Sequence, residues 1–395
     1  MSASRTQTTV MLGLAQTLSW ASSYYLPAVL AAPMARAVGA SYATVFAAFS
    51  LALLVSAATG PVAGRLIDRL GGRPVLIASN LVFAAGLGLL SQATQTHQVF
   101  IAWAVMGLAM GSGLYEAAFA TVVRLYGQDA RHAITGITLF AGFASTVGWP
   151  LSSYLASAWG WRETCMVWAL LHLLLGLPLN LLLPRASPVA VMPDSAGAAR
   201  GATAAPAALR RTALLMAYVF AVSWFISTAM AAHLPQLLQA SGAALAVAIG
   251  AAALVGPAQV AGRLVEYRFL QNAHPLLSAR LAILAHPLAA LCLGLLGAPA
   301  ATVFAIVHGL GNGILTIAVG TLPLKLFGAR GYGQRQGWLM VPARIVQAGS
   351  PFLYGMAVAQ WGTGALWLSA LLGLSAFAAL CCMRVAPEPA VRVAP

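Results

Sequence analysis

The stretch GRLIDRLGGRP, residues 64–74, concentrates four charged side chains in a chain where such residues are scarce. An apolar run lies on each side of it, at about 42–63 and 74–93. Each run is close to the ~20 residues that an α-helix needs to cross the hydrocarbon core of a bilayer. The stretch is therefore predicted to be a polar loop that joins two membrane-spanning helices.

The composition extends this interpretation to the whole chain. Of its 395 residues, 61% are hydrophobic and 7% are charged, whereas a typical soluble domain carries about 25% charged residues. Backbone polar groups in lipid must be paired internally, which leaves helices or a closed barrel, and the alternating strands of a barrel are absent. We therefore expect an all-α membrane protein with twelve transmembrane helices. The predicted spans are 10–32, 42–63, 74–93, 98–123, 134–158, 164–184, 212–234, 243–262, 280–296, 299–324, 337–359 and 363–384.

The basic residues lie mainly on one side of the predicted membrane. Of the 21 lysines and arginines, 18 fall in alternate loops or at the termini, two (Arg36 and Arg162) fall on the other side, and Arg344 lies within a span. The positive-inside rule then places both termini in the cytoplasm, and we expect a multi-pass protein of a bacterial-type inner membrane. This distribution explains the net charge of +14 without a nucleic-acid partner.

The two halves of the chain repeat each other. GPVAGRLID (60–68) is echoed by GPAQVAGRLVE (256–266), and RLYG (124–127) by KLFG (325–328). A polar segment rich in Ala, Pro, Gly and Ser separates the halves and is predicted to be a flexible linker. We therefore expect an N-terminal six-helix bundle at 1–184, a cytoplasmic linker at 185–211 and a C-terminal six-helix bundle at 212–395, built as a pseudo-symmetric pair.

The loop at 64–74 resembles the signature of the major facilitator superfamily, in which it joins the second and third helices. The resemblance implies a transporter that works by alternating access, with its substrate site between two bundles near the membrane midplane. One further basic residue of that signature is replaced by Pro74. The matching residues are Gly64, Asp68, Arg69, Gly71 and Arg73.

A conformational latch is implied at the same loop. In the superfamily's fold this loop meets the beginning of the eleventh helix, predicted here near Gly337. Asp68 would then face the positive end of that helix dipole, a contact worth ~0.3–2 kcal/mol depending on exposure. Arg124 is the second expected partner. The alternative is a solvated loop whose basic residues only set the topology.

Two weaker resemblances bear on the substrate. LYGQDARHAITG (125–136) resembles the loop between the fourth and fifth helices of monocarboxylate transporters, and SWA (19–21) fits half of the first-helix motif of that family. The fifth span, with GFASTVGWP (142–150), lacks the ending typical of drug/proton antiporters. These features favour an organic anion.

Two predicted spans carry a formal charge deep inside, Glu116 in the fourth and Arg344 in the eleventh. A charge at the bilayer centre costs at least ~2.5–3.5 kcal/mol on insertion scales, so such residues face a cavity or a partner. Arginine suits a carboxylate because its planar fork donates two parallel hydrogen bonds. Either the substrate and Glu116 compete for Arg344, or protonation of Glu116 frees Arg344 for the substrate. The alternative is a permanent ion pair that fixes helix packing.

Other polar and aromatic residues share helical faces that are expected to line the same cavity. They are Gln16, Trp20 and Tyr24 in the first span, Trp224 and Thr228 in the seventh, His308 and Asn312 in the tenth, and Gln347 in the eleventh. The aromatic residues equally suit core or interfacial packing. His308 suits either a proton carrier or a hydrogen-bonded packing residue.

These features predict a secondary active transporter of a small organic anion, expected to be a carboxylate, with protons as a possible coupling ion. We expect a monomer without cofactor or metal, since no metal-ligand spacing, phosphate-binding loop or other enzyme motif is found. The first alternative is an efflux transporter of drug-like or amphipathic compounds. The second is a membrane sensor or receptor on the same scaffold that does not transport.

Overall fold

The computed structural model describes residues 4–185 and 207–383, and within these ranges the chain forms helices and no strand. Nine helical stretches in the described part are long and apolar enough to cross a membrane. One of them, Thr96–Ala158, has 63 residues, about three times the length of one crossing. The all-helical prediction is confirmed, while the count of twelve spans stays a prediction because length and composition alone do not count crossings.

Each of the six spans predicted in the first half coincides with one helix or with consecutive helices. These elements are α1 (Arg5–Ser22), α2 (Leu26–Ala37), α3 (Tyr42–Leu70), α4 (Gly72–Ser91), α5 (Thr96–Gly113), α6 (Tyr115–Tyr126), η1 (Gly127–Ala130), α7 (Arg131–Ala141), α8 (Ala144–Ala158), α9 (Trp161–Leu171), η2 (His172–Gly176) and α10 (Leu177–Leu181).

The second half follows the same pattern. Its elements are α11 (Ala207–Ala240), α12 (Leu245–Ala253), α13 (Val255–Val265), η3 (Glu266–Leu270), α14 (Pro275–Leu296), η4 (Ala298–Ala300), α15 (Ala301–Phe327), α16 (Tyr332–Trp361), η5 (Gly362–Gly364) and α17 (Ala365–Cys381).

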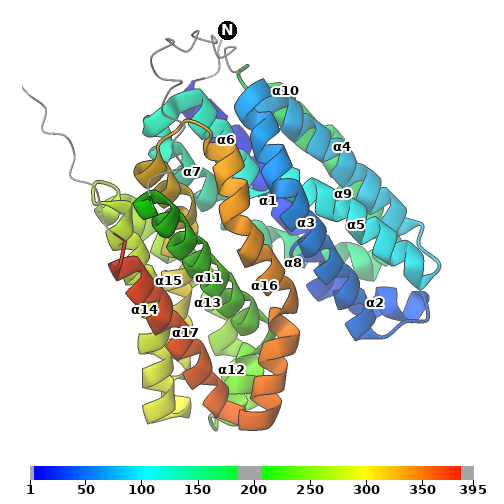
Figure 1. The fold of residues 1–395 in the computed structure, drawn as a ribbon. Helices are drawn as coiled ribbons and strands as arrows, with labels where there is room; N and C mark the ends of the chain where they lie inside the picture. The colour runs from blue at the N-terminus through cyan, green and yellow to red at the C-terminus, as the bar shows by residue number, and fades with distance from the viewer. Residues whose placement is uncertain (1–3, 186–206, 384–395) are drawn as a thin grey trace, which may run out of the picture.

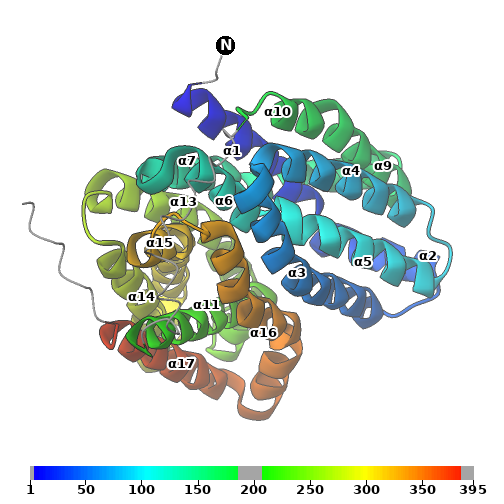
Figure 2. The same ribbon diagram turned by 45° about the horizontal axis from the view of Figure 1, so that its top comes forward.

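The helices form two groups that meet along α3 and α16. Figure 1 shows the first-half helices, blue to cyan-green, beside the second-half helices, green to red, and Figure 2 shows the same division from a tilted view. Two clusters of buried apolar residues match these groups: one spans 12–183 and adds Leu324 and Tyr332, and the other spans 216–383. The domain limits at 184 and 212 stay predictions, because most of the predicted linker lies outside the described residues.

Several spans are broken near their middle, and the breaks position polar groups. α5 and α6 are separated by Leu114, which has an extended backbone, and α7 and α8 by Gly142 and Phe143. A break frees backbone carbonyl and amide groups that an intact helix would pair internally, so in a membrane it must be buried in protein or line a cavity. Discontinuous helices of this kind form substrate sites in many transporters.

The expected start of the eleventh helix near Gly337 is wrong by five residues. α16 begins at Tyr332, directly after Gly331, whose φ of 63° is a left-handed conformation that glycine adopts without strain. The first turn, YGQRQ (332–336), is polar, so hydropathy alone assigned it to the loop. It forms helix because its amide groups find an acceptor in the other half of the molecule.

Candidate functional site

The break at Leu114 places Glu116 in the first turn of α6. The side chain therefore lies at the positive end of a helix dipole. The break also frees the carbonyl oxygen of Gly113, and the amide of Gln16 donates a hydrogen bond to it at 2.7 Å. Gln16, predicted to bind substrate, is 1% exposed and here stabilises the broken span.

Arg344 and Glu116 form an ion pair between the two groups of helices. Nη2 of Arg344 donates to Oε1 of Glu116 at 2.8 Å, and the two side chains are 4% and 15% exposed. Nη1 of Arg344 donates to Oε1 of Gln347 at 2.9 Å. Both ends of the guanidinium fork are thus occupied in this conformation, and the pair satisfies two charges that lipid alone would not tolerate.

A chain of hydrogen bonds continues from Gln347 to both first and seventh spans. Its Nε2 donates to the hydroxyl of Tyr24 at 2.9 Å and to Oγ1 of Thr228 at 3.2 Å. The two hydroxyl groups are themselves 3.3 Å apart. One polar network therefore joins four parts of the chain: the turn between α1 and α2, which carries Tyr24, and the helices α6, α11 and α16.

Aromatic rings form the wall next to this network. The Cζ atom of Arg344 lies 5.0 Å from the ring centroid of Trp224, a cation–π contact. Trp224 stacks parallel to Trp20 with centroids 6.3 Å apart, and Trp20 in turn contacts Tyr115 at 4.9 Å. The wall thus runs from Arg344 across the boundary between the two halves.

The structure does not bring His308 and Asn312 into this network. His308 pairs with His286 through their Nδ1 atoms at 3.0 Å, deep among α14, α15 and α17. The amide of Asn312 donates to the hydroxyl of Ser227 at 3.0 Å. The shared helical face that the sequence indicated is real, but these two residues are occupied by neighbours within the second half.

A small pocket lies beside the ion pair. It has a volume of about 10 Å³, which holds about one water molecule. Its lining includes Ser56, Gly60, Glu116, Met340 and Arg344. A substrate therefore reaches the network only if the helices around it separate.

The stretch at 64–74 meets the first turn of α16, as the resemblance implied, but it is not the predicted loop. Residues 64–70 continue α3 and residues 72–74 begin α4, so only Gly71 lies between the two helices. The carboxylate of Asp68 accepts hydrogen bonds from the backbone N–H of Gly333, at 2.9 Å, and of Gln334, at 2.8 Å. Nε of Arg124 donates to the backbone oxygen of Asp68 at 3.3 Å. We name the two bonds made by the Asp68 carboxylate the latch contact; its role in conformational change stays a prediction.

Glycines allow the close approach that the latch contact requires. A Cβ atom on Gly64 would collide with the backbone of Gly333, and one on Gly337 would lie 2.6 Å from the Cα of Pro61. Gly71, with a φ of 83°, ends α3 and turns the chain into α4. Of the two remaining predicted latch residues, Arg69 is exposed and Arg73 lines a surface pocket beside Leu70.

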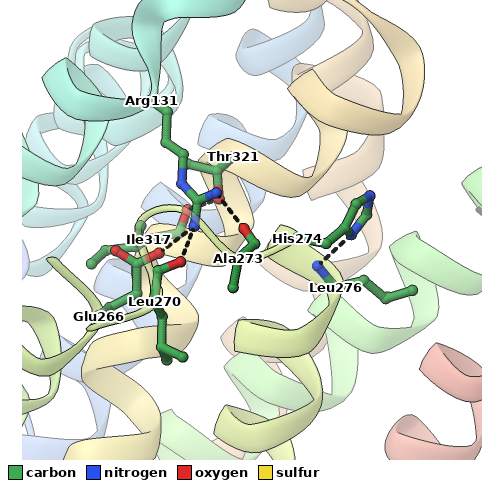
Figure 3. A network of polar contacts seen from close by, with 8 residues as sticks. All are labelled: Arg131, Glu266, Leu270, Ala273, His274, Leu276, Ile317 and Thr321. Atoms are coloured by element: carbon green, nitrogen blue, oxygen red, sulfur yellow. Dashed lines mark hydrogen bonds and ion pairs between the residues drawn. The ribbon is translucent and has the colours of Figure 1, made fainter. Parts of the chain in front are cut away.

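A second contact joins the two halves at the same end of the molecule (Figure 3). Nη2 of Arg131, the first residue of α7, donates to Oε1 of Glu266 at 2.8 Å and to the backbone oxygen of Leu270 at 2.9 Å. Its Nη1 donates to the backbone oxygen of Ala273 at 2.6 Å. We name these bonds the Arg131 contact. Sequence reasoning placed Arg131 in a loop that sets the topology, although the echo between Asp68 and Glu266 was a usable signal.

The comparison with known families agrees with this geometry. A sequence profile of the Major Facilitator Superfamily matches residues 12–341. The chain belongs to the Major Facilitator Superfamily. Members of this superfamily are transporters and not enzymes, so the chain is a multi-pass membrane transporter, and the predicted family and fold are confirmed.

Individual relatives match only part of the chain. It is 28% identical to monocarboxylate transporter 2 of Homo sapiens over 121 residues, 30% of this chain and 25% of the relative. It is 33% identical to a chloramphenicol resistance protein of Pseudomonas aeruginosa over 142 residues, 35% and 33% of the two chains. It is 31% identical to the 4-hydroxybenzoate transporter PcaK of Pseudomonas putida over 127 residues, 31% and 28%. The chain thus spans a third or less of the length of these curated relatives.

Solved structures support the fold across nearly the whole chain. The proton:xylose symporter XylE, bound to 6-bromo-6-deoxy-D-glucose, superposes with a TM-score of 0.73 at 13% identity, covering 95% of this chain and 94% of that one. The human organic anion transporter MFSD10 superposes with a TM-score of 0.66 at 16% identity, covering 95% and 99%. At these identities the likeness concerns the fold alone.

Proposed function

We propose that the protein is a secondary active transporter of a small organic anion, a carboxylate, which it carries by alternating access in an inner membrane with both termini cytoplasmic. The observation that carries this proposal is the buried Arg344, held at the boundary between the two halves by Glu116 and Gln347. Arginine keeps its charge at any physiological pH and offers a carboxylate two parallel hydrogen bonds. The similarity to monocarboxylate transporter 2 and to the 4-hydroxybenzoate transporter supports the same class.

The ion pair supports a proposal of proton coupling. While Glu116 is ionised, the pair is neutral and Oε1 occupies Nη2 of Arg344. A proton taken up by Glu116 removes the negative charge, and Arg344 is then free to donate to a substrate carboxylate. One proton and one monovalent anion thus enter the site together, without a net buried charge.

The latch contact and the Arg131 contact supply the conformational step. Both join the first half to the second at one end of the molecule, the end that we expect to face the cytoplasm because it carries most of the basic residues. We propose that they hold this end closed and that both break when the site opens inward. The repeat relates them, because Asp68 and Glu266 occupy equivalent positions in the two halves.

A second candidate is efflux of a drug-like compound. It is favoured by the aromatic wall of Trp20 and Trp224 and by the similarity to a chloramphenicol resistance protein. Such a substrate need not be an anion, so it would not depend on a free guanidinium group. The identity of the substrate class therefore decides between the two candidates.

Uptake into proteoliposomes separates them, with monocarboxylates, dicarboxylates and chloramphenicol offered with and without a pH gradient. We expect an imposed inward proton gradient to drive carboxylate uptake, Arg344→Ala to abolish it, and Arg344→Lys to restore it only in part, because lysine lacks the planar fork. Glu116→Gln should lose the pH dependence, whereas Glu163→Gln, on an exposed side chain, should keep it. Full uptake of carboxylate by Arg344→Ala would show that the anion site is elsewhere.

A further inference from the structure

Arg263 and Arg344 are the two buried arginines among the described residues. Arg263 lies within a helix, whereas the sequence placed it in a loop. It lies on α13 and is 5% exposed. Its Nε and Nη1 atoms are buried and have no hydrogen-bond partner. The fold thus buries two donors of a cationic group without pairing them, which costs free energy.

The buried acidic groups of the described residues are engaged elsewhere. Glu116 is paired with Arg344, and Glu266, one turn along from Arg263, is paired with Arg131. The carboxylate of Asp68 is taken up by the latch contact. No acidic side chain in the described ranges is bonded to Arg263, including Oε2 of Glu266, which is itself buried without a partner, so an anion from outside the chain can take the unpaired donors of Arg263.

The guanidinium group points to the break between α7 and α8. A Cβ atom on Gly142 would collide with Nη1 of Arg263, so the glycine leaves the space that the guanidinium occupies. Helix side chains lean toward the N-terminus of their own helix. From α13 this direction carries the charge away from the end of the molecule that holds the latch contact, toward the level of the broken spans.

The aromatic wall lies on this side of the molecule. On α1, the hydroxyl of Thr17 donates to the backbone oxygen of Phe140, next to this break, at 3.0 Å. Trp20 lies three residues further along α1 and packs against Tyr115 at 4.9 Å. The indole Nε1 of Trp20 is a further buried donor without an acceptor. Unpaired donors beside stacked rings suit a ligand that has an anionic group and a flat apolar body.

The equivalent residue of the first half behaves differently. Arg65 stands at the matching place in the repeat, but it is exposed, and its Nε and Nη2 lie 3.2 and 2.9 Å from the side-chain amide of Gln334, whose oxygen accepts from both once that amide is turned. The repeat alone therefore does not explain why Arg263 is buried without a partner.

We propose that Arg263 is a second anion-binding group of the substrate site, and that the substrate is an aromatic carboxylate. Its carboxylate accepts hydrogen bonds from Arg263 while its ring packs against Trp20 and Tyr115. This inference rests on the proposed transport of anions. It assigns the first binding of the anion to Arg263, because Arg344 is already neutralised by Glu116 in this conformation.

The test is binding of benzoate to the purified full-length protein by calorimetry, with benzamide as the neutral probe of the same shape. We expect wild type to bind benzoate and not benzamide. Arg263→Gln should weaken benzoate binding by roughly 10- to 100-fold, the scale of hydrogen bonds to a charged group, and Arg263→Lys should weaken it less. Arg268→Gln, at an exposed arginine one turn further along, is the matched control and should bind as wild type does.

Thermal unfolding without ligand distinguishes binding from a structural role. If Arg263 serves the ligand, Arg263→Gln removes an unpaired buried charge, so the apparent Tm stays equal or rises while the stabilisation by benzoate is lost. Gly142→Ala keeps the charge but displaces the guanidinium, and it should also weaken benzoate binding. If Arg263→Gln binds benzoate with wild-type affinity, or if its Tm without ligand is lowered, the inference is overturned and the proposed function still stands. Failure of the wild type to bind benzoate while it takes up an aliphatic carboxylate overturns the inference but not the function, whereas uptake of no anion at all overturns both.

Discussion

The latch contact makes a quantitative prediction for Asp68→Asn. The half-buried carboxylate accepts from two adjacent N–H groups in the first turn of α16, those of Gly333 and Gln334. An asparagine offers one oxygen and turns its NH₂ group toward the other donor, and it also removes the negative charge from the positive end of the helix. The substitution therefore opposes the closed conformation specifically.

The size of the effect follows from this geometry. An acidic group at a helix N-terminus contributes up to ~2 kcal/mol when it is partly buried. A loss of about 1–2 kcal/mol from the closed state raises the open-to-closed ratio by roughly 5- to 30-fold. The ion pair of Arg344 with Glu116 is unaffected by the change, so the substrate site keeps its composition.

The assay is the labelling rate of a single thiol with a membrane-impermeant maleimide. Ser56→Cys, in a background without the four native cysteines, places the thiol in the small pocket beside the ion pair, at a position 4% exposed in this conformation. Opening of the end that carries the latch contact uncovers it, so the labelling rate follows the open population. Asp129→Asn is the control, because that side chain is 80% exposed and lies outside the contact.

The expected result is a labelling rate about 5- to 30-fold higher for Asp68→Asn and unchanged for Asp129→Asn. A rate equal to that of the parent protein refutes the reasoning, since the two hydrogen bonds would then contribute equally to both conformations. In that case the contact is packing only.

Two further substitutions probe the same end of the molecule. Gly64→Ala sets a Cβ atom against the backbone of Gly333, so we expect faster thiol labelling than in the parent protein. The control is Gly60→Ala, whose Cβ would lie 3.9 Å from the nearest atom and which should label at the parent rate. Equal labelling rates for the two variants would show that close backbone approach at Gly64 does not hold this end closed. Arg131→Gln removes the partner of Glu266, whose side chain is 1% exposed. We therefore expect the free energy of unfolding to fall by roughly 3 kcal/mol. The double variant Arg131→Gln with Glu266→Gln should recover part of this stability. A double variant no more stable than the single one would argue that the backbone contacts, and not the ion pair, carry the energy.

Much of the fold was predictable because its causes are local in sequence. A bilayer demands long apolar helices, and within the described residues the predicted spans fall on helices, while their number stays a prediction. The stretch at 64–74 was interpreted correctly as a junction because charges are excluded from hydrocarbon, but its prediction as a loop is wrong, since residues 64–70 are the last turns of α3 and residues 72–74 begin α4. Hydropathy failed at the first turn of α16, which is polar and helical because Asp68 accepts from it.

The candidate site was predictable in part. Arg344 and Glu116 were recognisable because a charge inside a span needs a partner, but the sequence left open whether that partner was the other residue or the substrate. The structure pairs them in this conformation. It also turns Gln16 and His308 toward neighbours within their own halves, which a shared helical face does not reveal.

The sequence by itself determined that the chain is surrounded by lipid, that it is helical, that its halves repeat and which family it resembles. Each of these depends on composition or on short spacings along the chain. Only the tertiary structure decided which charges are compensated. Arg65 and Arg263 occupy equivalent places in the repeat, yet the first is exposed and bonded while the second is buried with two unpaired donors. The difference arises because burial and pairing depend on what the other half of the molecule brings within hydrogen-bond distance, about 3 Å, and that arrangement is not written in either stretch alone.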